Sequence, residues 1–367
     1  MTEIVLSGTG LFTPAESISN AELVESFNSY VREANPGRPD DDQLPESSAE
    51  FVLKASGIEH RKVMDKAGIL DPRRMRPQFP ARPDSEISMQ AEMGLAASLE
   101  ALKSAGVEGS EVDAVLVACS NFQRAYPAIA VELQERLSAQ GFAYDMNVAC
   151  SSATFGIAQA VSLVATGAAR RALVVSPEIC TAHLNFRDRD SHFIFGDACT
   201  AVVVEAADGQ RGKEPYRVLG CKLSTKFSNN IRNNRGFLTR CEDRPDDDPA
   251  LLFYQEGRKV FKDVTGLVAT HLESHLKEHD LEPSSLKSYW LHQANAAMNH
   301  LIAKKLLGRE ASAEEAPLIL DEYANTSSAG SIIAFHQHRS HLQKGDIGAI
   351  CSFGAGYSIG SVIVEKL

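Results

Sequence analysis

The chain has 367 residues, of which 44% are hydrophobic and 23% are charged, an ordinary composition for a globular protein. A net charge of −11 argues against a nucleic-acid-binding protein, because no basic face is implied overall. No apolar run approaches the roughly 20 residues of a membrane span, so we expect no membrane partner.

Cysteine usage indicates a reducing environment. The seven cysteines are odd in number and include no Cys-x-x-Cys pair. This pattern predicts a cytoplasmic protein without a disulfide framework, a zinc cluster or another metal site. Residues 1–7 are expected to form a strand rather than a signal peptide, because they lack a basic start and a long apolar core.

Hydrophobic periodicity predicts alternating strands and helices in the first third of the chain. We expect strands at 4–11 and 113–118, and helices capped by Ser19, at 48–58, at 87–105 with its end at a glycine cap, Gly106, and at 127–137. Residues 35–86 differ in composition, with prolines at 36, 39, 45, 72, 77, 80 and 83 and an acidic run at 40–42. They are predicted to form an exposed insertion that is mostly irregular.

A short apolar run ends at Cys150 and is followed by a helical stretch of small residues up to Gly167. We predict a strand, a tight junction and a buried helix with Cys150 at its N-terminus. The positive end of a helix favours a thiolate, and Ser151 and Ser152 are candidates to cap the first turn. Taken alone, the pattern also fits a buried structural cysteine.

The second half of the chain repeats the first. Four pairs of segments match in the same order: 93–99 with 265–271, 115–121 with 289–295, 149–153 with 324–329, and 196–205 with 356–365. This order predicts two copies of one α/β unit, which we place at 1–210 and 211–367. The repeat aligns Cys150 with Asn325.

Two similar halves imply a pseudo-two-fold arrangement in which Cys150 and Asn325 face a shared cleft. His292 follows the predicted strand 289–291 and opens toward the same cleft. These three residues form a candidate catalytic constellation. The glycine-rich stretch 352–360 lacks the spacing of a dinucleotide loop, but it can bring a backbone N–H close to a developing oxyanion.

An ordered set of motifs resembles the thiolase-fold condensing enzymes, specifically β-ketoacyl-[acyl-carrier-protein] synthase III. The motifs lie at 147–152, 195–197, 260–262, 292–295, 325–327 and 353–356. The resemblance covers nearly the whole chain. It implies an α/β, thiolase-like fold whose two mixed-sheet halves form a five-layer αβαβα core, and it implies a homodimer.

The resemblance also implies a mechanism. The Cys150 thiolate attacks an acyl-CoA, with the oxyanion held by the N–H groups of Cys150 and of Ala355 in the glycine loop. Malonyl-acyl carrier protein then loses CO₂, and His292 and Asn325 donate hydrogen bonds to the resulting enolate. The acyl-CoA is a substrate, and no cofactor is implied.

Further contacts follow from the same resemblance. Expected substrate contacts are Tyr126, Gly257, Asn295 and Phe353, with Tyr126 reaching across the dimer to limit the acyl pocket. Expected carrier-protein contacts are Lys262, Lys304 and Lys305.

The chain departs from the family pattern at two basic positions. Ala55 and Ala297 stand where the family usually has basic residues, and Arg258 is a candidate to share those roles.

Segments 185–192 and 227–234 and the early insertion resemble a subgroup primed by octanoyl-CoA, the β-ketodecanoyl-[acyl-carrier-protein] synthases. An alternative is a thiolase-fold acyltransferase that uses other primers or CoA-linked extenders.

Three other classes fit less well. A papain-like hydrolase carries its cysteine near the mature N-terminus. A biosynthetic thiolase needs a second cysteine where Ser352 stands, and Cys351 should point to the opposite face of the strand. A non-catalytic scaffold would have lost Cys150.

Overall fold

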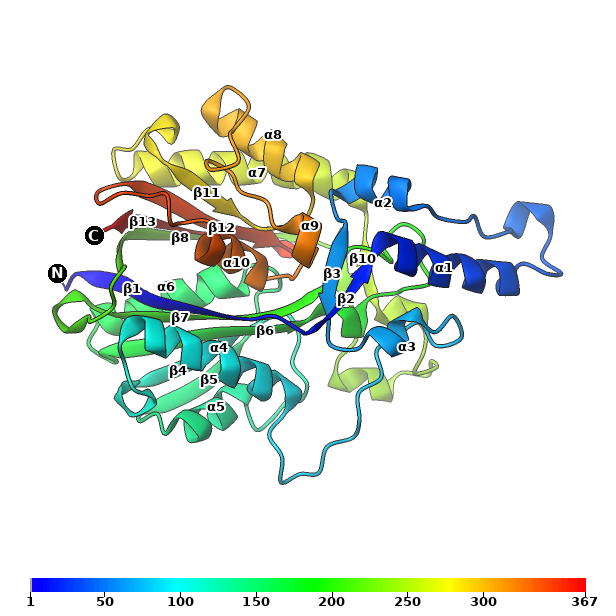
Figure 1. Cartoon of the computed structure of the whole chain (residues 1–367), viewed down its shortest axis with the longest axis horizontal. Helices are drawn as coiled ribbons and strands as arrows, with labels where there is room; N and C mark the ends of the chain where they lie inside the picture. Colours follow the sequence, from blue (N-terminus) through cyan, green and yellow to red (C-terminus); the bar gives the residue numbers. More distant parts are fainter. Residues whose placement is uncertain (1) are drawn as a thin grey trace.

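Two groups of strands, one from each half of the chain, lie on either side of a central pair of helices (Figure 1). The computed structural model describes residues 2–367. The strands of the first half are β1 (Ile4–Phe12), β4 (Ala114–Ala118), β5 (Phe142–Met146), β6 (Arg171–Ile179) and β7 (Asp197–Ala206). Those of the second half are β8 (Tyr216–Ser228), β11 (Ser288–Leu291), β12 (Ile347–Gly354) and β13 (Gly356–Lys366).

Hydrogen bonds connect all nine strands in the order β11-β12-β13-β8-β1-β7-β6-β4-β5. The halves meet where β1 pairs with β8, through Val5 with Arg217 and Leu6 with Tyr216. In the first half β4 pairs in parallel with both β5 and β6, while β6 pairs antiparallel with β7. In the second half β11 pairs in parallel with β12, while β12 pairs antiparallel with β13. The predicted mixed sheets are therefore confirmed.

Six helices complete five layers. Helices α6 (Ser152–Ala165) and α10 (Ala329–Gln337) lie between the two sheets and share one apolar core with both. Helices α4 (Met89–Ala105) and α5 (Ile129–Leu137) cover the outer face of the first sheet. Helices α7 (Gly257–Lys277) and α8 (Ala296–Leu307) cover that of the second. The predicted αβαβα order is confirmed.

Local sequence signals place several helix ends. Helix α1 (Asn20–Ala34) begins with a capping box, in which the Ser19 hydroxyl accepts from the backbone N–H of Glu22 and the Glu22 carboxylate accepts from that of Ser19. Helix α4 ends at Gly106, which adopts the left-handed conformation predicted for it. Helix α2 (Ala49–Ser56) lies within the predicted 48–58 segment.

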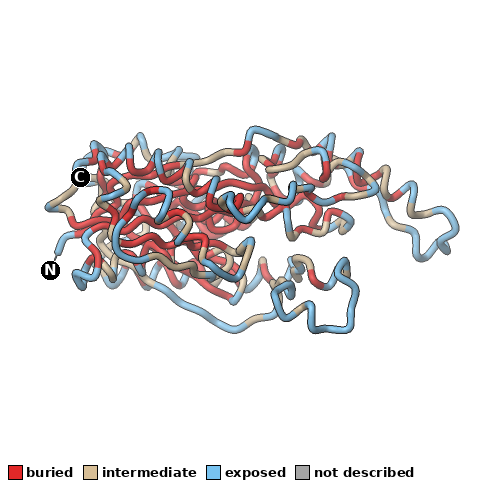
Figure 2. Tube along the Cα trace, turned by 90° about the horizontal axis from the view of Figure 1, so that it is seen from below, coloured by how far each residue is buried: buried red, intermediate tan, exposed pale blue. Residues whose placement is uncertain are grey.

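The region 35–86 contains more structure than its composition predicts. Besides α2 it holds β3 (His60–Val63), which pairs with β2 (Glu16–Ser19), and α3 (Lys66–Leu70). These elements share a buried cluster with segment 180–195 and with α9 (Leu320–Tyr323). Exposed loops extend from this lobe, which lies at the right of Figure 1 and carries long exposed stretches in Figure 2.

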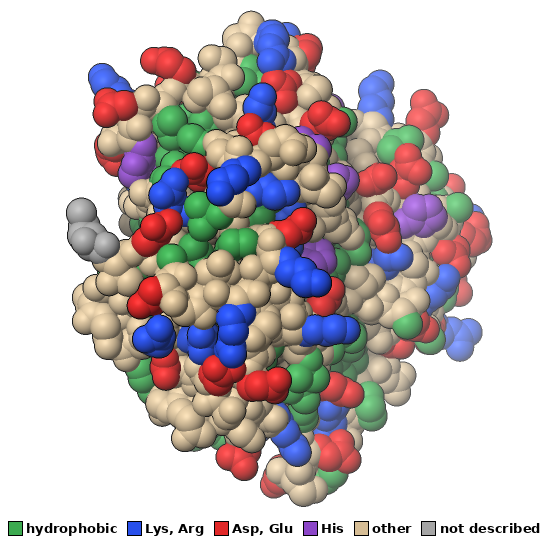
Figure 3. Space-filling view, turned by 60° about the vertical axis from the view of Figure 1, so that its left-hand side comes forward, with side chains coloured by type: hydrophobic (Ala, Val, Ile, Leu, Met, Phe, Trp, Pro, Cys, Tyr) green, Lys and Arg blue, Asp and Glu red, His purple; other side chains and the backbone are tan. Residues whose placement is uncertain are grey.

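The surface carries both signs of charge. On the face drawn in Figure 3, acidic and basic side chains are interspersed. Within residues 2–367, no helix combines the length and hydropathy needed to cross a membrane.

Candidate active site

Cys150 lies in a sharp turn between β5 and α6. Ala149, directly before it, has a φ of +47°. The Asn147 side chain holds this turn: its Oδ1 accepts from the Ala149 N–H at 2.8 Å, and its Nδ2 donates to the Ser120 carbonyl at 2.7 Å. The turn therefore presents the Cys150 side chain to the cavity rather than to the sheet.

The two serines after Cys150 do not cap α6 as the sequence predicts. The Ser151 hydroxyl donates to the Ser358 carbonyl at 3.0 Å. The Ser152 hydroxyl donates to the Ala149 carbonyl at 2.7 Å and accepts from the Val148 N–H at 2.8 Å. Both serines instead fix the cysteine turn, the first by linking it to the second half of the chain.

The predicted lowering of the cysteine pKa is wrong for the free enzyme. Burial raises the pKa of the Cys150 thiol to about 11, and the carboxylate of Glu178 adds to this effect. The Ser327 hydroxyl and the Ala355 N–H oppose it by favouring the thiolate. Because burial outweighs these donors, Cys150 is a neutral thiol at pH 7 and must lose its proton during attack.

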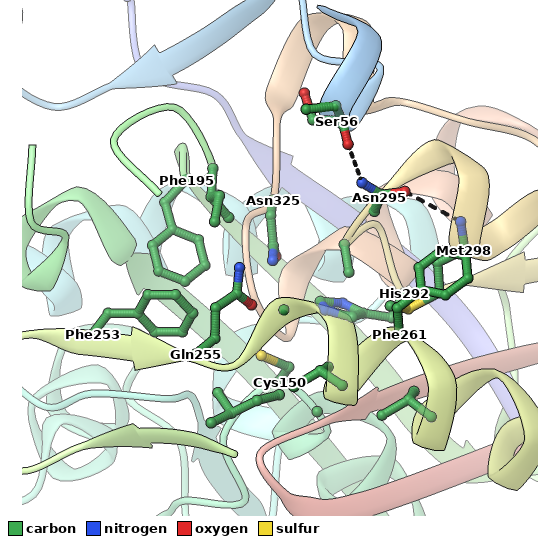
Figure 4. A pocket seen from close by; sticks show the side chains of 18 of the residues that line it. Ser56, Cys150, Phe195, Phe253, Gln255, Phe261, His292, Asn295, Met298 and Asn325 are labelled. Carbon is green, nitrogen blue, oxygen red and sulfur yellow. Dashed lines mark hydrogen bonds between the residues drawn. The ribbon is translucent and has the colours of Figure 1, made fainter. Parts of the chain in front are cut away.

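Asn325 lies in the corresponding turn of the second half. Ala324 before it has a φ of +56°. The Asn325 Oδ1 accepts from the Ser327 N–H at 2.9 Å, which leaves its amide nitrogen facing the cavity (Figure 4). A buried side-chain amide held in this way is a ready hydrogen-bond donor for a negatively charged oxygen.

His292 follows β11 and is 2% exposed. Its backbone N–H donates to the Cys351 carbonyl at 2.8 Å, and its ring packs edge-on against the ring of Phe353, with 5.2 Å between the ring centroids. Burial lowers the pKa of His292 to about 4, partly opposed by the backbone of Ser327. The imidazole is therefore neutral at pH 7, and its Nδ1 finds no hydrogen-bond partner among residues 2–367.

These three side chains line one cavity of about 570 Å³ (Figure 4). They approach it from three elements and from both halves of the chain. Its other walls are largely apolar and include Phe51, Phe193, Ile194, Phe195, Ile231, Phe253, Val260, Phe261, Val264 and Met298. An apolar cavity with a few convergent polar groups is the usual form of a small-molecule site.

Three of the four predicted substrate contacts, Gly257, Asn295 and Phe353, line the cavity. Asn295 also serves the protein itself, since it donates to the Ala55 carbonyl at 2.6 Å and caps α8. Tyr126 does not line the cavity of its own chain and is 85% exposed.

The predicted carrier-protein lysines differ in position. Lys262 is exposed on α7, whose first residues line the cavity. Lys304 forms an ion pair with Glu310 at 2.5 Å. Lys304 and Lys305 lie in the last turn of α8, about 14 to 15 Å along the helix from Asn295. Their carrier-protein role stays a prediction, and Lys262 is better placed for it.

Each half also supplies a Phe-Gly turn that packs against the other half. A Cβ added at Gly354 would lie 2.6 Å from the Cβ of Cys150. A Cβ added at Gly196 would lie 2.2 Å from the carbonyl oxygen of Tyr323, next to the asparagine turn. The Gly196 N–H also donates to the Asn325 carbonyl at 3.1 Å. Close contact of this kind requires residues without a side chain at both positions.

Sequence reasoning missed two residues that act on the pKa of the thiol: Ser327, whose hydroxyl favours the thiolate, and Glu178, whose carboxylate disfavours it. The repeated serines after Asn325 were a usable signal for the first. Nothing in the sequence around Glu178 distinguishes it from other strand residues. Cys351, as expected, packs with the outer helices rather than in the cavity.

Residues 144–226 match the family described as 3-oxoacyl-[acyl-carrier-protein (ACP)] synthase III, and residues 276–366 match its C-terminal family. The β-ketodecanoyl-[acyl-carrier-protein] synthase of Pseudomonas aeruginosa is 57% identical over 349 residues, which cover 94% of this chain and 100% of that protein. The β-ketoacyl-[acyl-carrier-protein] synthase III of Chelativorans sp. is 29% identical over 326 residues, with coverages of 87% and 91%.

Solved structures share the fold at lower identity. FabH, the 3-oxoacyl-(acyl carrier protein) synthase III of Pseudomonas aeruginosa, has a TM-score of 0.76 at 23% identity, covering 99% of this chain and 98% of that one. OleA of Xanthomonas campestris, with bound lauric acid and lauroyl-CoA, has a TM-score of 0.74 at 14% identity, covering 99% of both. Together with the relative of 57% identity, these findings show that the chain belongs to the 3-oxoacyl-[acyl-carrier-protein] synthase III family of thiolase-fold condensing enzymes.

Proposed function

We propose that this enzyme catalyses the decarboxylative Claisen condensation of a medium-chain acyl-CoA with malonyl-acyl carrier protein. The products are β-ketoacyl-acyl carrier protein, CO₂ and CoA, and the reaction initiates or feeds fatty acid synthesis. The observation that carries the proposal is the convergence of Cys150, His292 and Asn325 on one apolar cavity.

In the first step the Cys150 sulfur attacks the thioester carbonyl of the acyl-CoA. The new S–C bond forms, the bond to the CoA sulfur breaks, and the thiol proton ends on CoA. We assign the transfer of this proton to His292, whose ring lines the same cavity as the thiol. The N–H groups of Ala355 and Cys150, which favour negative charge at the sulfur, are suited to the oxyanion of the tetrahedral intermediate.

In the second step malonyl-acyl carrier protein replaces CoA. Loss of CO₂ leaves an enolate, whose oxygen accepts hydrogen bonds from the Asn325 amide and the His292 ring. The carbanion attacks the Cys150 thioester, and the sulfur leaves as a thiolate, which takes up a proton from solvent to restore the thiol. A neutral imidazole suits this role, because it donates a hydrogen bond without protonating the nascent carbanion.

The medium-chain primer rests on two supports. The 57% identical relative is named a β-ketodecanoyl-[acyl-carrier-protein] synthase. The aromatic and aliphatic wall of the cavity provides an apolar surface for an alkyl chain. Other primers, or an extender linked to CoA, are the alternative that an experiment must separate.

A homodimer in the cytoplasm is part of the same proposal. Strand β5 ends the sheet and has one unpaired edge, and Phe142 on it is 38% exposed and stacks on Tyr144. The exposed Tyr126 precedes α5, the helix that packs against this strand. An apolar edge of this kind favours pairing with a second copy. All seven cysteines are free thiols, which suits a reducing compartment.

The test is intact-mass analysis after exposure to acyl-CoAs from acetyl- to dodecanoyl-CoA, followed by malonyl-acyl carrier protein or malonyl-CoA. We expect the largest adduct with octanoyl-CoA, borne by Cys150 and discharged by the carrier-linked extender. Preferential discharge by malonyl-CoA would support the alternative. A stable adduct that survives in Cys150→Ser on another residue would refute the proposal.

A further inference from the structure

Glu178 is a buried carboxylate that the proposed mechanism does not use. It lies at the end of β6 and is 1% exposed. Within residues 2–367 no basic side chain forms an ion pair with it; its oxygens accept four hydrogen bonds from hydroxyl and backbone N–H groups, and the Cys180 thiol lies 3.9 Å from its Oε2. An ionised group buried without a counter-ion is costly to a fold, so its hydrogen-bond partners indicate what it does.

Two of its partners connect it to the cysteine turn. The Ser120 N–H donates to Oε1 at 3.0 Å, and the Ser120 hydroxyl donates to Oε2 at 2.6 Å. The Ser120 carbonyl in turn accepts from Asn147, the side chain that holds the Ala149 N–H. Two hydrogen-bonding residues therefore link Glu178 to the backbone just before Cys150.

The other two partners belong to the asparagine turn. The Ser328 N–H donates to Oε1 at 3.2 Å, and the Ser328 hydroxyl donates to the same oxygen. Ser328 directly follows Ser327, whose N–H fixes the Asn325 amide. One carboxylate thus binds the asparagine turn directly and reaches the cysteine turn through Ser120 and Asn147, across the boundary between the two halves.

We propose that Glu178 is a positioning residue that clamps the Cys150 turn to the Asn325 turn and sets the distance between the nucleophile and the enolate-binding amide. The proposal rests on the proposed function for the meaning of that distance. Backbone hydrogen bonds already join the asparagine turn to the first half: the Asn325 N–H donates to the Ile194 carbonyl at 3.0 Å, and the Gly196 N–H donates to the Asn325 carbonyl at 3.1 Å. Glu178 adds a side-chain link from this turn to Ser120 and, through Asn147, to the cysteine turn.

The charge of Glu178 provides an independent readout. Its carboxylate disfavours the Cys150 thiolate, as does burial. The other titratable groups around the thiol are His292 after β11, Cys180 after β6, and Asp190 and Arg258, which line the same cavity. Because His292 is neutral at pH 7, removal of the Glu178 charge should dominate any change in thiol ionisation.

Three variants test the clamp. Glu178→Gln keeps the shape and most hydrogen bonds but removes the charge, and Glu178→Ala leaves the two serines without their acceptor. Glu205→Gln is the matched control, because Glu205 is equally buried in β7 but pairs with Arg171 at 2.6 Å, away from the cavity. Each variant is assayed for Cys150 alkylation by iodoacetamide across pH and for decarboxylation of malonyl-acyl carrier protein.

We expect Glu178→Gln to shift the alkylation profile to lower pH and to keep decarboxylation within about threefold of wild type. We expect Glu178→Ala to lower decarboxylation by at least about tenfold, because a displacement near 1 Å can cost up to about 100-fold. Glu205→Gln should leave the alkylation profile unchanged. Wild-type decarboxylation in Glu178→Ala together with an unshifted profile in Glu178→Gln would overturn the proposal.

The two arms separate this proposal from the proposed function. If the wild-type enzyme does not decarboxylate malonyl-acyl carrier protein, the proposed function fails. The alkylation arm needs no substrate, and it still decides whether Glu178 acts on the Cys150 turn.

Discussion

The cysteine turn and the asparagine turn are built on the same plan, but they hold their functional side chains differently. Both lie directly before a central helix, α6 or α10, and place an alanine with positive φ before the functional residue. In the first turn a separate side chain, Asn147, binds the backbone. In the second, Asn325 binds its own turn through Oδ1 and presents its nitrogen to the cavity.

This difference explains how duplication yields two roles in one site. In the proposed mechanism the first half supplies a nucleophile with free motion at sulfur, so another residue holds the turn. The second half supplies an amide in one fixed orientation, so the same side chain holds the turn and is free to donate to substrate through its nitrogen. Gly354 packs on the first turn and Gly196 packs beside the second, and each contact fixes the position of a turn relative to the other half of the chain.

The largest expected effects are losses of activity, and they should fall on a different reaction step for each turn. Cys150→Ala should abolish acyl transfer, a loss on the order of 10³-fold or more, because the nucleophile is absent. Asn325→Ala should still acquire the acyl group but lose about 10²–10³-fold in malonyl-acyl carrier protein decarboxylation. Intact mass and CO₂ release measure the two steps. Equal loss of both steps in Asn325→Ala would show that the turns are not functionally distinct.

The next largest effect tests the glycine contacts. Gly354→Ala should slow acylation by about tenfold or more, because the added methyl group displaces the side chain of Cys150. Gly196→Ala should impair decarboxylation more than acylation, since its methyl group meets the backbone before Asn325.

Gly266→Ala on α7 is the control for both glycine variants, because no atom lies within 4 Å of its added Cβ and alanine favours a helix. Acylation by Gly354→Ala at the wild-type rate would contradict the packing seen around Cys150.

A smaller effect concerns pH. With the pKa of Cys150 raised to about 11, iodoacetamide alkylation of the free enzyme should rise about tenfold per pH unit from 7 to 9.5, because the thiolate fraction does. With the pKa of His292 lowered to about 4, decarboxylation should stay flat from pH 7.5 to 6, since the ring remains neutral above its pKa. A plateau of alkylation below pH 8 would show that the helix end outweighs burial.

The smallest effect compares the two strained alanines. Ala149→Gly and Ala324→Gly should each change the free energy of unfolding by no more than about 1 kcal/mol, because relief of positive φ offsets the entropy of glycine. The Ala324→Gly variant is expected to be the more stable of the two relative to wild type, since the ψ of −156° at this position lies in a region that favours glycine. Urea unfolding measures both. Destabilisation of Ala324→Gly by several kcal/mol would rule out backbone strain there.

The sequence predicted much of this molecule because its signals are local or repeated. Helix caps at Ser19 and Gly106 depend on neighbours within a few residues, and the structure confirms them. The internal repeat aligns Cys150 with Asn325, and both residues line the cavity. The ordered motifs gave the family, which the 57% identical relative shows.

Predictions that depended on competition between distant groups were less successful. Ser151 and Ser152 have the chemistry of helix caps, but partners brought in by the fold, such as the Ser358 carbonyl, bind one of them instead. The helix N-terminus favours a thiolate, yet burial of Cys150 outweighs it. Lys304, predicted as a carrier-protein contact, pairs with Glu310, a residue in the loop after α8.

The sequence by itself determined the duplicated α/β plan, the three side chains at the cavity and the family, because periodicity and motif order survive in one dimension. Only the tertiary structure decided the protonation states of Cys150 and His292 and the link through Glu178. Burial and hydrogen bonding depend on residues far apart in the chain, such as Ser120 and Ser328, which both bind Glu178. No local sequence pattern predicts which of these residues are in contact.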